Sequence, residues 1–372
     1  MTSSQKSRNW ALDCLRLAAV LLVICRHQLG QPEGVLAPLW QFVHRGGGVG
    51  VDLFFVLSGY LVSGLLFKEY ALHRSLDWKR FLVRRGLKIY PAFYLWLAAM
   101  LIPLALKGKL PPWGLIFSEA CFVQNYFGTI PPHHFHTWSL AVEEHFYLLL
   151  TGLLVFLAWR GRGAANPFSG LPKIVIGMAM IFLGFRLLAN RTPLDVHFGL
   201  LAWSHLRMDS LAFGVLLAYR AQFHRAELSD WVKEHRLWLV LGGMAALIPA
   251  FTLTWEGSWW LRTFGFTCNY LGAGALVLVA ALAFESQPPS RLIRLAAWLG
   301  ASSYSIYLWH MEVILRLHAK MHLALGIPIT WTWIITLFAC LGVGVFTGWI
   351  IEWPILRWRD RLYPSRSQKL AI

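Results

Sequence analysis

The chain has 372 residues, of which 57% are hydrophobic and only 14% are charged, and its formal net charge is +16. A water-soluble domain cannot bury so much apolar surface, so the composition indicates an integral membrane protein. The positive charge does not indicate nucleic-acid binding, because the Lys and Arg residues lie mainly in short segments between apolar runs. The five cysteines have neither disulfide nor metal spacing.

Apolar runs recur along the whole chain and predict an all-α bundle of about ten membrane-spanning helices. A span needs roughly 20 residues. The first run lacks a small-residue cleavage site, so it is expected to stay as an anchor. The stretch 113–127 is too short and too broken to span, and we expect an interfacial or re-entrant piece there. The expected spans are 11–27, 49–67, 89–106, 138–158, 174–189, 208–219 (short, borrowing from its flanks), 237–254, 263–283, 296–315 and 329–351.

The distribution of basic residues predicts the orientation. If the spans alternate from an inside N-terminus, 23 of the 34 Lys and Arg fall in inside segments and 6 fall in outside loops, among them Arg207. Cytoplasmic loops carry such an excess, so both termini are predicted in the cytoplasm. No repeat and no appended soluble domain is expected, and residues 1–372 are interpreted as a single membrane domain.

The first predicted span carries ionisable residues that are costly at membrane depth. His27 follows Arg16 by eleven positions, which is about 20° past three helical turns and about 16 Å along the axis. Asp13 lies one turn before Arg16 and can pair with it. The stripe is either functional, or Arg16 and Asp13 pair for structure and His27 reaches the interface.

The second predicted span contains Asp52 and Ser58 within an apolar run. The glycines at 48, 50 and 59 permit close approach of another backbone. A serine at such a place is typical of a helix–helix hydrogen bond, so Ser58 alone is weak support for a functional site.

The fourth predicted span carries two adjacent carboxylates, Glu143 and Glu144, near its start. Ser139 and Tyr147 lie one turn to either side of Glu143. The carboxylates either pair with Arg or His of another span or serve as acid or base.

A basic helical face precedes the third predicted span. Arg80, Arg84 and Lys88 recur at every fourth position, and Arg85 flanks them. The face is either ordinary inside charge that contacts anionic lipid, or a clamp for a phosphorylated cytoplasmic substrate.

The last two predicted spans add Ser303, Tyr307 and His310 at helical spacing, and Glu352 at the end of the final span, where it can pair with a basic loop. The histidines at 133, 134, 136 and 145 have no H-E-x-x-H spacing, so no metal site is expected.

Six elements in this order make the chain resemble the membrane-bound acyltransferase-3 family over nearly its whole length. Lys88 stands where the family more often has Arg, and His145 where Gln is common. Many relatives carry an extracytoplasmic hydrolase-like domain, which is not expected here. The elements are Arg16-x10-His27, Phe54 to Gly59, the basic stretch 84–91 ending in Pro91, Trp138 to Tyr147, Tyr304 to His310, and Glu352 to Pro354.

The resemblance implies a membrane O-acyltransferase of the bacterial cytoplasmic membrane. Its donor would be a cytoplasmic acyl-CoA, with acetyl-CoA favoured, and its acceptor a hydroxyl of an envelope or exported glycan. No permanently bound cofactor is implied, and membrane lipids are the other expected partners.

The resemblance also implies roles for the site residues. His27 would be a general base or a transient acyl carrier. Arg16 would hold a carbonyl or phosphate of the donor. Glu143 or Glu144 would orient His27 or bind the acceptor, and the basic residues Arg84, Arg85 and Lys88 would hold the CoA phosphates. Asp13, Asp52, Ser58, Ser139, Tyr147, Tyr307, His310 and Glu352 would support the site.

Two other functions fit the same residues. A glycan or small-molecule transporter could use intramembrane Arg, His and Glu as a relay or substrate path. A membrane subunit without chemistry would tolerate alanine singly at Arg16, His27 and Glu143.

Overall fold

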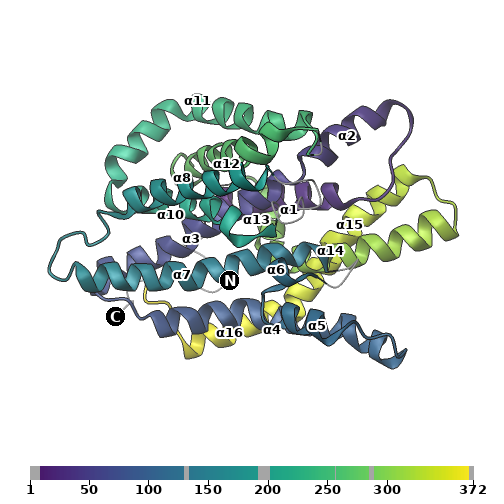
Figure 1. The fold of residues 1–372 in the computed structure, drawn as a ribbon, viewed down its shortest axis with the longest axis horizontal. Helices are drawn as coiled ribbons and strands as arrows, with labels where there is room; N and C mark the ends of the chain where they lie inside the picture. The colour runs from purple at the N-terminus through teal and green to yellow at the C-terminus, as the bar shows by residue number, and fades with distance from the viewer. Residues whose placement is uncertain (1–8, 130–133, 192–201, 256, 285–288, 368–372) are drawn as a thin grey trace.

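The structure is a computed structural model that describes residues 9–129, 134–191, 202–255, 257–284 and 289–367. Throughout these residues the regular secondary structure is helical, and no strand occurs among them, as Figure 1 shows. The predicted all-α class is therefore confirmed.

The described first half of the chain contains five long helices that cover expected spans, although α4 begins eleven residues before the expected start of its span. The Asn9 side chain caps α1 by accepting from the backbone N–H groups of Ala11 and Leu12, and Asp77 caps α4. The elements are α1 (Trp10–His27), η2 (Gly34–Leu36), α2 (Ala37–Gly46), α3 (Val49–His73), α4 (Trp78–Leu106), α5 (Trp113–Ala120), α6 (Gln124–Phe127), η3 (Phe135–Thr137), α7 (Trp138–Arg160) and α8 (Leu171–Ala189).

The described second half also contains short elements, and three of them are π-helical. Its elements are η5 (Ser204–Leu206), α10 (Met208–Phe223), α11 (Arg225–Thr252), the π-helix η6 (Leu261–Gly265), α12 (Phe266–Leu282), α13 (Arg291–Ala301), α14 (Ser303–Leu317), the π-helix η7 (His318–Ala324), α15 (Ile329–Thr347), the π-helix η8 (Gly348–Glu352) and α16 (Trp353–Leu362).

Seven helical segments of the described chain are long and apolar enough to cross a membrane, so the chain is a multi-pass membrane protein. The three remaining expected spans fall short for different reasons. Helix α1 carries Asp13, Arg16 and Arg26, and α10 has only 16 residues. The run 296–315 was expected to be one span but is divided between α13 and α14 at Ser302, because apolar periodicity alone does not distinguish one long helix from two shorter ones.

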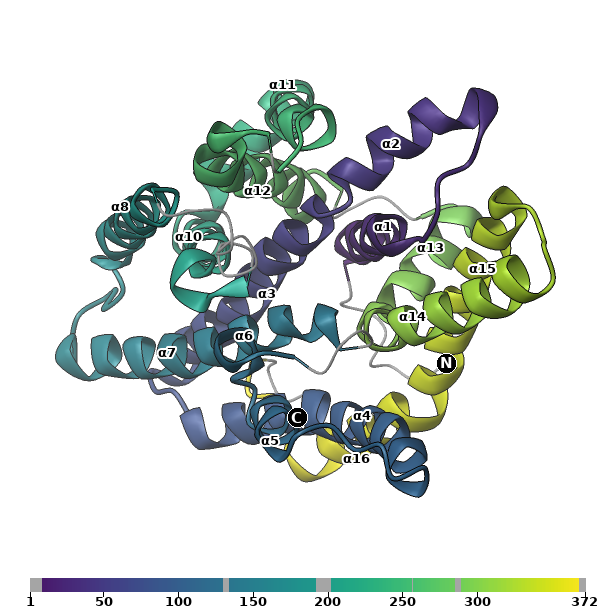
Figure 2. The same ribbon diagram turned by 45° about the vertical axis from the view of Figure 1, so that its right-hand side comes forward.

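Helix α1 lies at the centre of the bundle, in contact with α2, α3, α12, α13 and α14 (Figure 2). Helix α3 packs closely on α10. A Cβ atom at Gly59 would lie 2.0 Å from the carbonyl oxygen of Leu211, and one at Gly50 would lie 2.4 Å from that of Ala19. The predicted close approach is confirmed at these two glycines and is wrong at Gly48, which has nothing within 4 Å.

Several segments that the distribution of Lys and Arg predicts on the cytoplasmic side of the membrane contact one another. Asn9 donates to the carbonyl of Ala281, Arg74 to that of Ala165, and Arg80 to that of Pro364. Spans that alternate in direction require such an arrangement. Three of the Lys and Arg residues in the predicted inside segments, Lys6, Arg8 and Lys369, lie outside the described residues.

A buried polar network joins α3, α8, α10 and α12. Arg207 pairs with Asp52 at 2.7 Å, and Arg186 pairs with Asp209 at 2.8 Å. Asn269 also donates to Asp52, at 3.0 Å. Arg207 was counted as an outside loop charge, yet it is only 2% exposed. The carboxylate of Asp52 explains why this cation is tolerated in the interior.

Candidate active site

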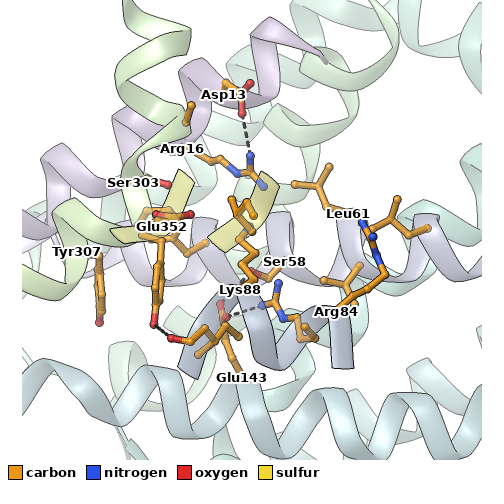
Figure 3. Close-up of a pocket in the computed structure, with 18 of the residues that line it drawn as sticks. Asp13, Arg16, Ser58, Leu61, Arg84, Lys88, Glu143, Ser303, Tyr307 and Glu352 are labelled. Atoms are coloured by element: carbon orange, nitrogen blue, oxygen red, sulfur yellow. Dashed lines mark hydrogen bonds and ion pairs between the residues drawn. The ribbon is translucent and has the colours of Figure 1, made fainter. Parts of the chain in front are cut away.

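A cavity of about 1070 Å³ opens between α1, α3, α4, α7, α13, α14 and α16, and we call it the central cavity (Figure 3). It gathers most of the residues that the sequence singled out, from six separate segments of the chain. The predicted residues that line it are Asp13, Arg16, Ser58, Arg84, Arg85, Lys88, Ser139, Glu143, Ser303, Tyr307 and Glu352.

Arg16 reaches the central cavity from α1 and pairs there with Asp13 at 2.8 Å. The predicted pair is therefore formed. The Asp13 side chain is 4% exposed and that of Arg16 is 23% exposed, so the guanidinium keeps a face toward the cavity.

Glu143 lies at the centre of a cluster in the cavity wall. Its Oε1 atom accepts a hydrogen bond from Ser58 at 2.9 Å. Its Oε2 atom accepts from Tyr147 at 2.9 Å and from Arg85 at 3.3 Å. The hydroxyl of Ser58 thus joins α3 to α7, as a helix–helix hydrogen bond would.

The adjacent carboxylate, Glu144, has a different environment. It is 7% exposed, accepts from the hydroxyl of Tyr90 at 2.9 Å and does not line the central cavity. Of the two glutamates, Glu143 is therefore the one that a molecule in the cavity can reach.

The predicted donor-binding residues Arg84 and Arg85 both contact carboxylates of the protein. Arg84 pairs with Asp360 at 2.9 Å and also donates to the carbonyl of Tyr363. Arg85 points inward to Glu143. Lys88 lines the cavity.

Three further arginines line the same cavity from the C-terminal third of the chain: Arg294 of α13 and Arg357 and Arg359 of α16. Arg359 shares Asp360 with Arg84. Among the described residues no carboxylate pairs with Arg294 or Arg357, and both are exposed. Sequence reasoning missed them because more than 200 positions separate them from the basic face of α4.

The cavity has two other polar contact points. Glu352, in η8, accepts from Ser305 at 2.8 Å. At the wall formed by α7 and α14, the hydroxyls of Ser139 and Tyr307 lie 2.6 Å apart, and Tyr307 also donates to the carbonyl of His136 at 2.8 Å.

His27 and His310 do not line the central cavity but lie next to its Tyr307 wall. The Nδ1 atom of His27 is 2.8 Å from the Nε2 atom of His310. The Nδ1 atom of His310 is 2.5 Å from the carbonyl oxygen of Tyr307. The ring of His136 lies 4.9 Å from that of His310.

The expectation that Glu143 or Glu144 orients His27 is corrected by this arrangement, because the side-chain partner of the His27 ring is His310. The two glutamates bond instead to Ser58, Tyr147 and Arg85 and to Tyr90, on α3, α4 and α7. One signal was available in the sequence: His310 is the one histidine in the predicted span 296–315.

Two other histidines that the sequence analysis considered, one in the loop before α7 and one within α7, contact other groups. His134 lies 3.5 Å from Glu119, and His145 lies 2.7 Å from the hydroxyl of Ser204. Across the described part of the chain no three His, Cys, Asp or Glu residues cluster as metal ligands. His133 lies outside the described residues.

Comparison with known proteins gives a family for this arrangement. A family model described as an acyltransferase domain matches residues 9–353. The chain is 30% identical to the peptidoglycan O-acetyltransferase OatA of Listeria monocytogenes, over 93% of this chain and 55% of the relative. It is 27% identical to the putative peptidoglycan O-acetyltransferase YrhL of Bacillus subtilis, over 97% of this chain and 56% of the relative.

A third relative is the O-acetyltransferase OatA of Staphylococcus aureus, which is 28% identical over 82% of this chain and 50% of the relative. The chain thus spans about half the length of the curated relatives it matches. No solved structure matches it.

Proposed function

The chain belongs to the acyltransferase-3 family, and from this premise we propose that it is a membrane O-acetyltransferase. It takes an acetyl group from cytoplasmic acetyl-CoA and transfers it to a hydroxyl of an envelope glycan, with peptidoglycan as the first candidate. The names of the relatives support both the reaction and the acceptor. The enzyme works in the bacterial cytoplasmic membrane.

The observation that carries this proposal is the central cavity, which joins a basic region to a group of hydroxyls. Acyl-CoA is a long molecule with a phosphorylated nucleotide at one end and a thioester at the other. Arginine binds phosphate oxygens with two parallel hydrogen bonds. Arg294 and Arg357, together with Lys88, suit the nucleotide, and the wall formed by Ser139 and Tyr307 suits the thioester.

The proposed topology has ten crossings with both termini in the cytoplasm. Helices α1 and α10 and the pair α13–α14 add to the seven longer segments, because all of them pack against other helices of the bundle. The excess of Lys and Arg supports this orientation. The basic region of the cavity then faces the cytoplasm, and His27 lies toward the outer side.

The proposed chemistry uses His27 in one of two ways. As a general base, it removes the proton of the acceptor hydroxyl while that oxygen attacks the thioester carbonyl; the C–S bond breaks, and the proton ends on the departing sulfur. As a carrier, its ring nitrogen first forms a bond to the acetyl carbon while the C–S bond breaks; the acceptor oxygen then displaces the ring nitrogen, and the hydroxyl proton ends on the departed thiolate. In both cases Arg16 contacts the donor, and Glu143 contacts either substrate from the cavity wall.

The test is acetyl transfer by the purified chain in lipid nanodiscs. Labelled acetyl-CoA and a soluble peptidoglycan fragment should give free CoA and an acetylated fragment in equal amounts. Mass spectrometry of envelope glycans from cells with and without the gene identifies the natural acceptor. A chain that moves glycan across vesicles without releasing free CoA would support the transporter and overturn the proposal.

A further inference from the structure

We propose that His310 is a positioning residue that holds His27 in the tautomer protonated at Nδ1, so that the Nε2 atom of His27 is the atom that works in the transfer. The inference rests on the proposed function for its catalytic meaning, but the tautomer itself follows from hydrogen bonds alone.

The first step is the contact between His310 and the backbone of Tyr307. A carbonyl oxygen can only accept a hydrogen bond. The Nδ1 atom of His310 lies 2.5 Å from the Tyr307 oxygen, so this nitrogen carries a proton. The ring is 0% exposed, so water does not replace this contact.

The second step follows from the valence of imidazole. A neutral ring has one donor nitrogen and one acceptor nitrogen. With Nδ1 as donor, the Nε2 atom of His310 is an acceptor, and a second proton would place an uncompensated charge in the interior at high cost. The His27 Nδ1 atom, 2.8 Å away, must therefore donate to it.

The third step concerns what remains on His27. Its Nδ1 atom is committed to His310, so the lone pair of the neutral ring is on Nε2. Fixing a catalytic imidazole by a hydrogen bond to its other nitrogen is the role that the aspartate has in serine-protease triads, where the wrong tautomer costs about 10⁴-fold in rate. Here a neutral histidine and a backbone carbonyl do the same work.

The support for His310 is rigid. Tyr307, whose carbonyl anchors the ring, is itself held by Ser139 at 2.6 Å and by the carbonyl of His136 at 2.8 Å. A Cβ atom at Gly344 of α15 would lie 2.4 Å from Ile306, so α14 and α15 are in close contact beside this turn. The pair is therefore not a contact between two mobile side chains.

In the general-base route, every proton that moves and every bond that breaks or forms can be assigned to a named atom. The acceptor O–H bond breaks and its proton moves to Nε2 of His27, the oxygen forms a bond to the thioester carbon, the C–S bond breaks, and the Nε2 proton passes to the thiolate. The Nδ1 proton stays between His27 and His310 throughout.

Two variants separate the functions of the His310 ring. In His310→Gln the amide oxygen comes near the place of Nε2 and can accept from His27. In His310→Asn the shorter amide can reach only the Tyr307 carbonyl. We expect kcat to fall about 10²-fold or more in the Asn variant and in His310→Leu, with the donor KM unchanged. The Gln variant should be at least about tenfold faster than either.

Equal losses in the Gln, Asn and Leu variants, with matched thermal stability, would overturn the inference, as would a His310→Leu enzyme with the wild-type kcat. These kinetic outcomes presuppose that the wild-type chain transfers acetyl groups, which the previous test establishes separately.

A spectroscopic test does not depend on activity. In ¹⁵N-histidine-labelled protein, the signals lost in His27→Ala identify the His27 ring. They should show a proton on Nδ1 in the wild type and in His310→Gln, and a proton on Nε2 in His310→Leu. A wild-type His27 protonated on Nε2 would end the proposal whatever the enzyme transfers.

Discussion

The guanidinium of Arg85 lies 3.3 Å from the carboxylate of Glu143 and 3.9 Å from the centre of the Tyr147 ring. The side chains of Arg85 and Glu143 are 14% and 15% exposed. The ion pair joins α4 to α7 in the wall of the central cavity. The hydroxyl of Ser58, on α3, donates a further hydrogen bond to the same carboxylate. Any change at Glu143 therefore acts on stability as well as on chemistry.

We expect Glu143→Ala to lower the free energy of unfolding by about 3–5 kcal/mol, because Arg85 loses its counter-charge in a nearly buried place. The double variant Arg85→Met, Glu143→Leu should recover much of this loss, since neither charge then remains. Thermal unfolding in detergent measures both effects. Glu234→Ala, an exposed position on α11, serves as the control and should shift stability by less than about 0.5 kcal/mol. Additive losses in the double variant would show that the two side chains do not form a pair.

The second prediction concerns the contact of α3 with α10. Gly59→Ala brings a Cβ atom to 2.0 Å from the backbone of Leu211, so the helices must separate, at a cost of about 1–3 kcal/mol. Gly64→Ala is on the same helix but has nothing within 4 Å, and it should be neutral or stabilising by up to about 1 kcal/mol. The thermal unfolding midpoints of the two variants, compared with that of the wild type, test this prediction. If both alanines have the same effect, the close approach of α3 and α10 does not exist in the membrane.

Local sequence patterns predicted the features that depend on neighbouring residues. The pair of Asp13 and Arg16 follows from helical spacing, as does the contact of Glu143 with Tyr147. The apolar runs placed most helices, because lipid requires that backbone groups bond within a helix. The break at Ser302 was missed because the apolar run continues through it.

Contacts between distant segments could not be predicted from one sequence. His27 and His310 are 283 positions apart, and Arg207 finds Asp52 across 155 positions. Nothing in either segment specifies the other. The resemblance to a family indicated that such residues belong to one site, but only the packing of α1 against α14 shows which nitrogen atoms meet.

The third prediction concerns the basic region of the cavity. Arg294→Glu and Arg357→Glu should each raise the KM for acetyl-CoA about tenfold or more and leave kcat nearly unchanged, because lost contacts to a non-reacting part of the substrate affect both bound states equally. Arg291→Glu is the control, since this residue is on the same helix α13 but does not line the cavity.

A shortened donor makes this test specific for phosphate. Acetyl-pantetheine lacks the phosphates of the nucleotide, so its KM should be the same in the wild type and in both cavity variants. A KM for acetyl-CoA that does not change in either variant would remove Arg294 and Arg357 from the donor site. An equal rise for acetyl-pantetheine would show that the variants disturb the cavity rather than a phosphate contact.

The last prediction concerns His27 itself. His27→Ala should leave the protein folded but lower its free energy of unfolding by about 1–3 kcal/mol, because the buried Nε2 atom of His310 loses its hydrogen-bond donor. Acetyl transfer should fall by about 10²–10⁴-fold, the usual loss when a general base is removed. His235→Ala, a partly exposed histidine on α11 whose ring nitrogen contacts the carbonyl of Trp231 in the same helix, should retain full activity. Incubation with labelled acetyl-CoA and no acceptor then separates the two roles: label stays on the wild-type protein if His27 carries the acetyl group and is absent if His27 acts as base. A folded His27→Ala protein that acetylates at the wild-type rate would contradict both roles.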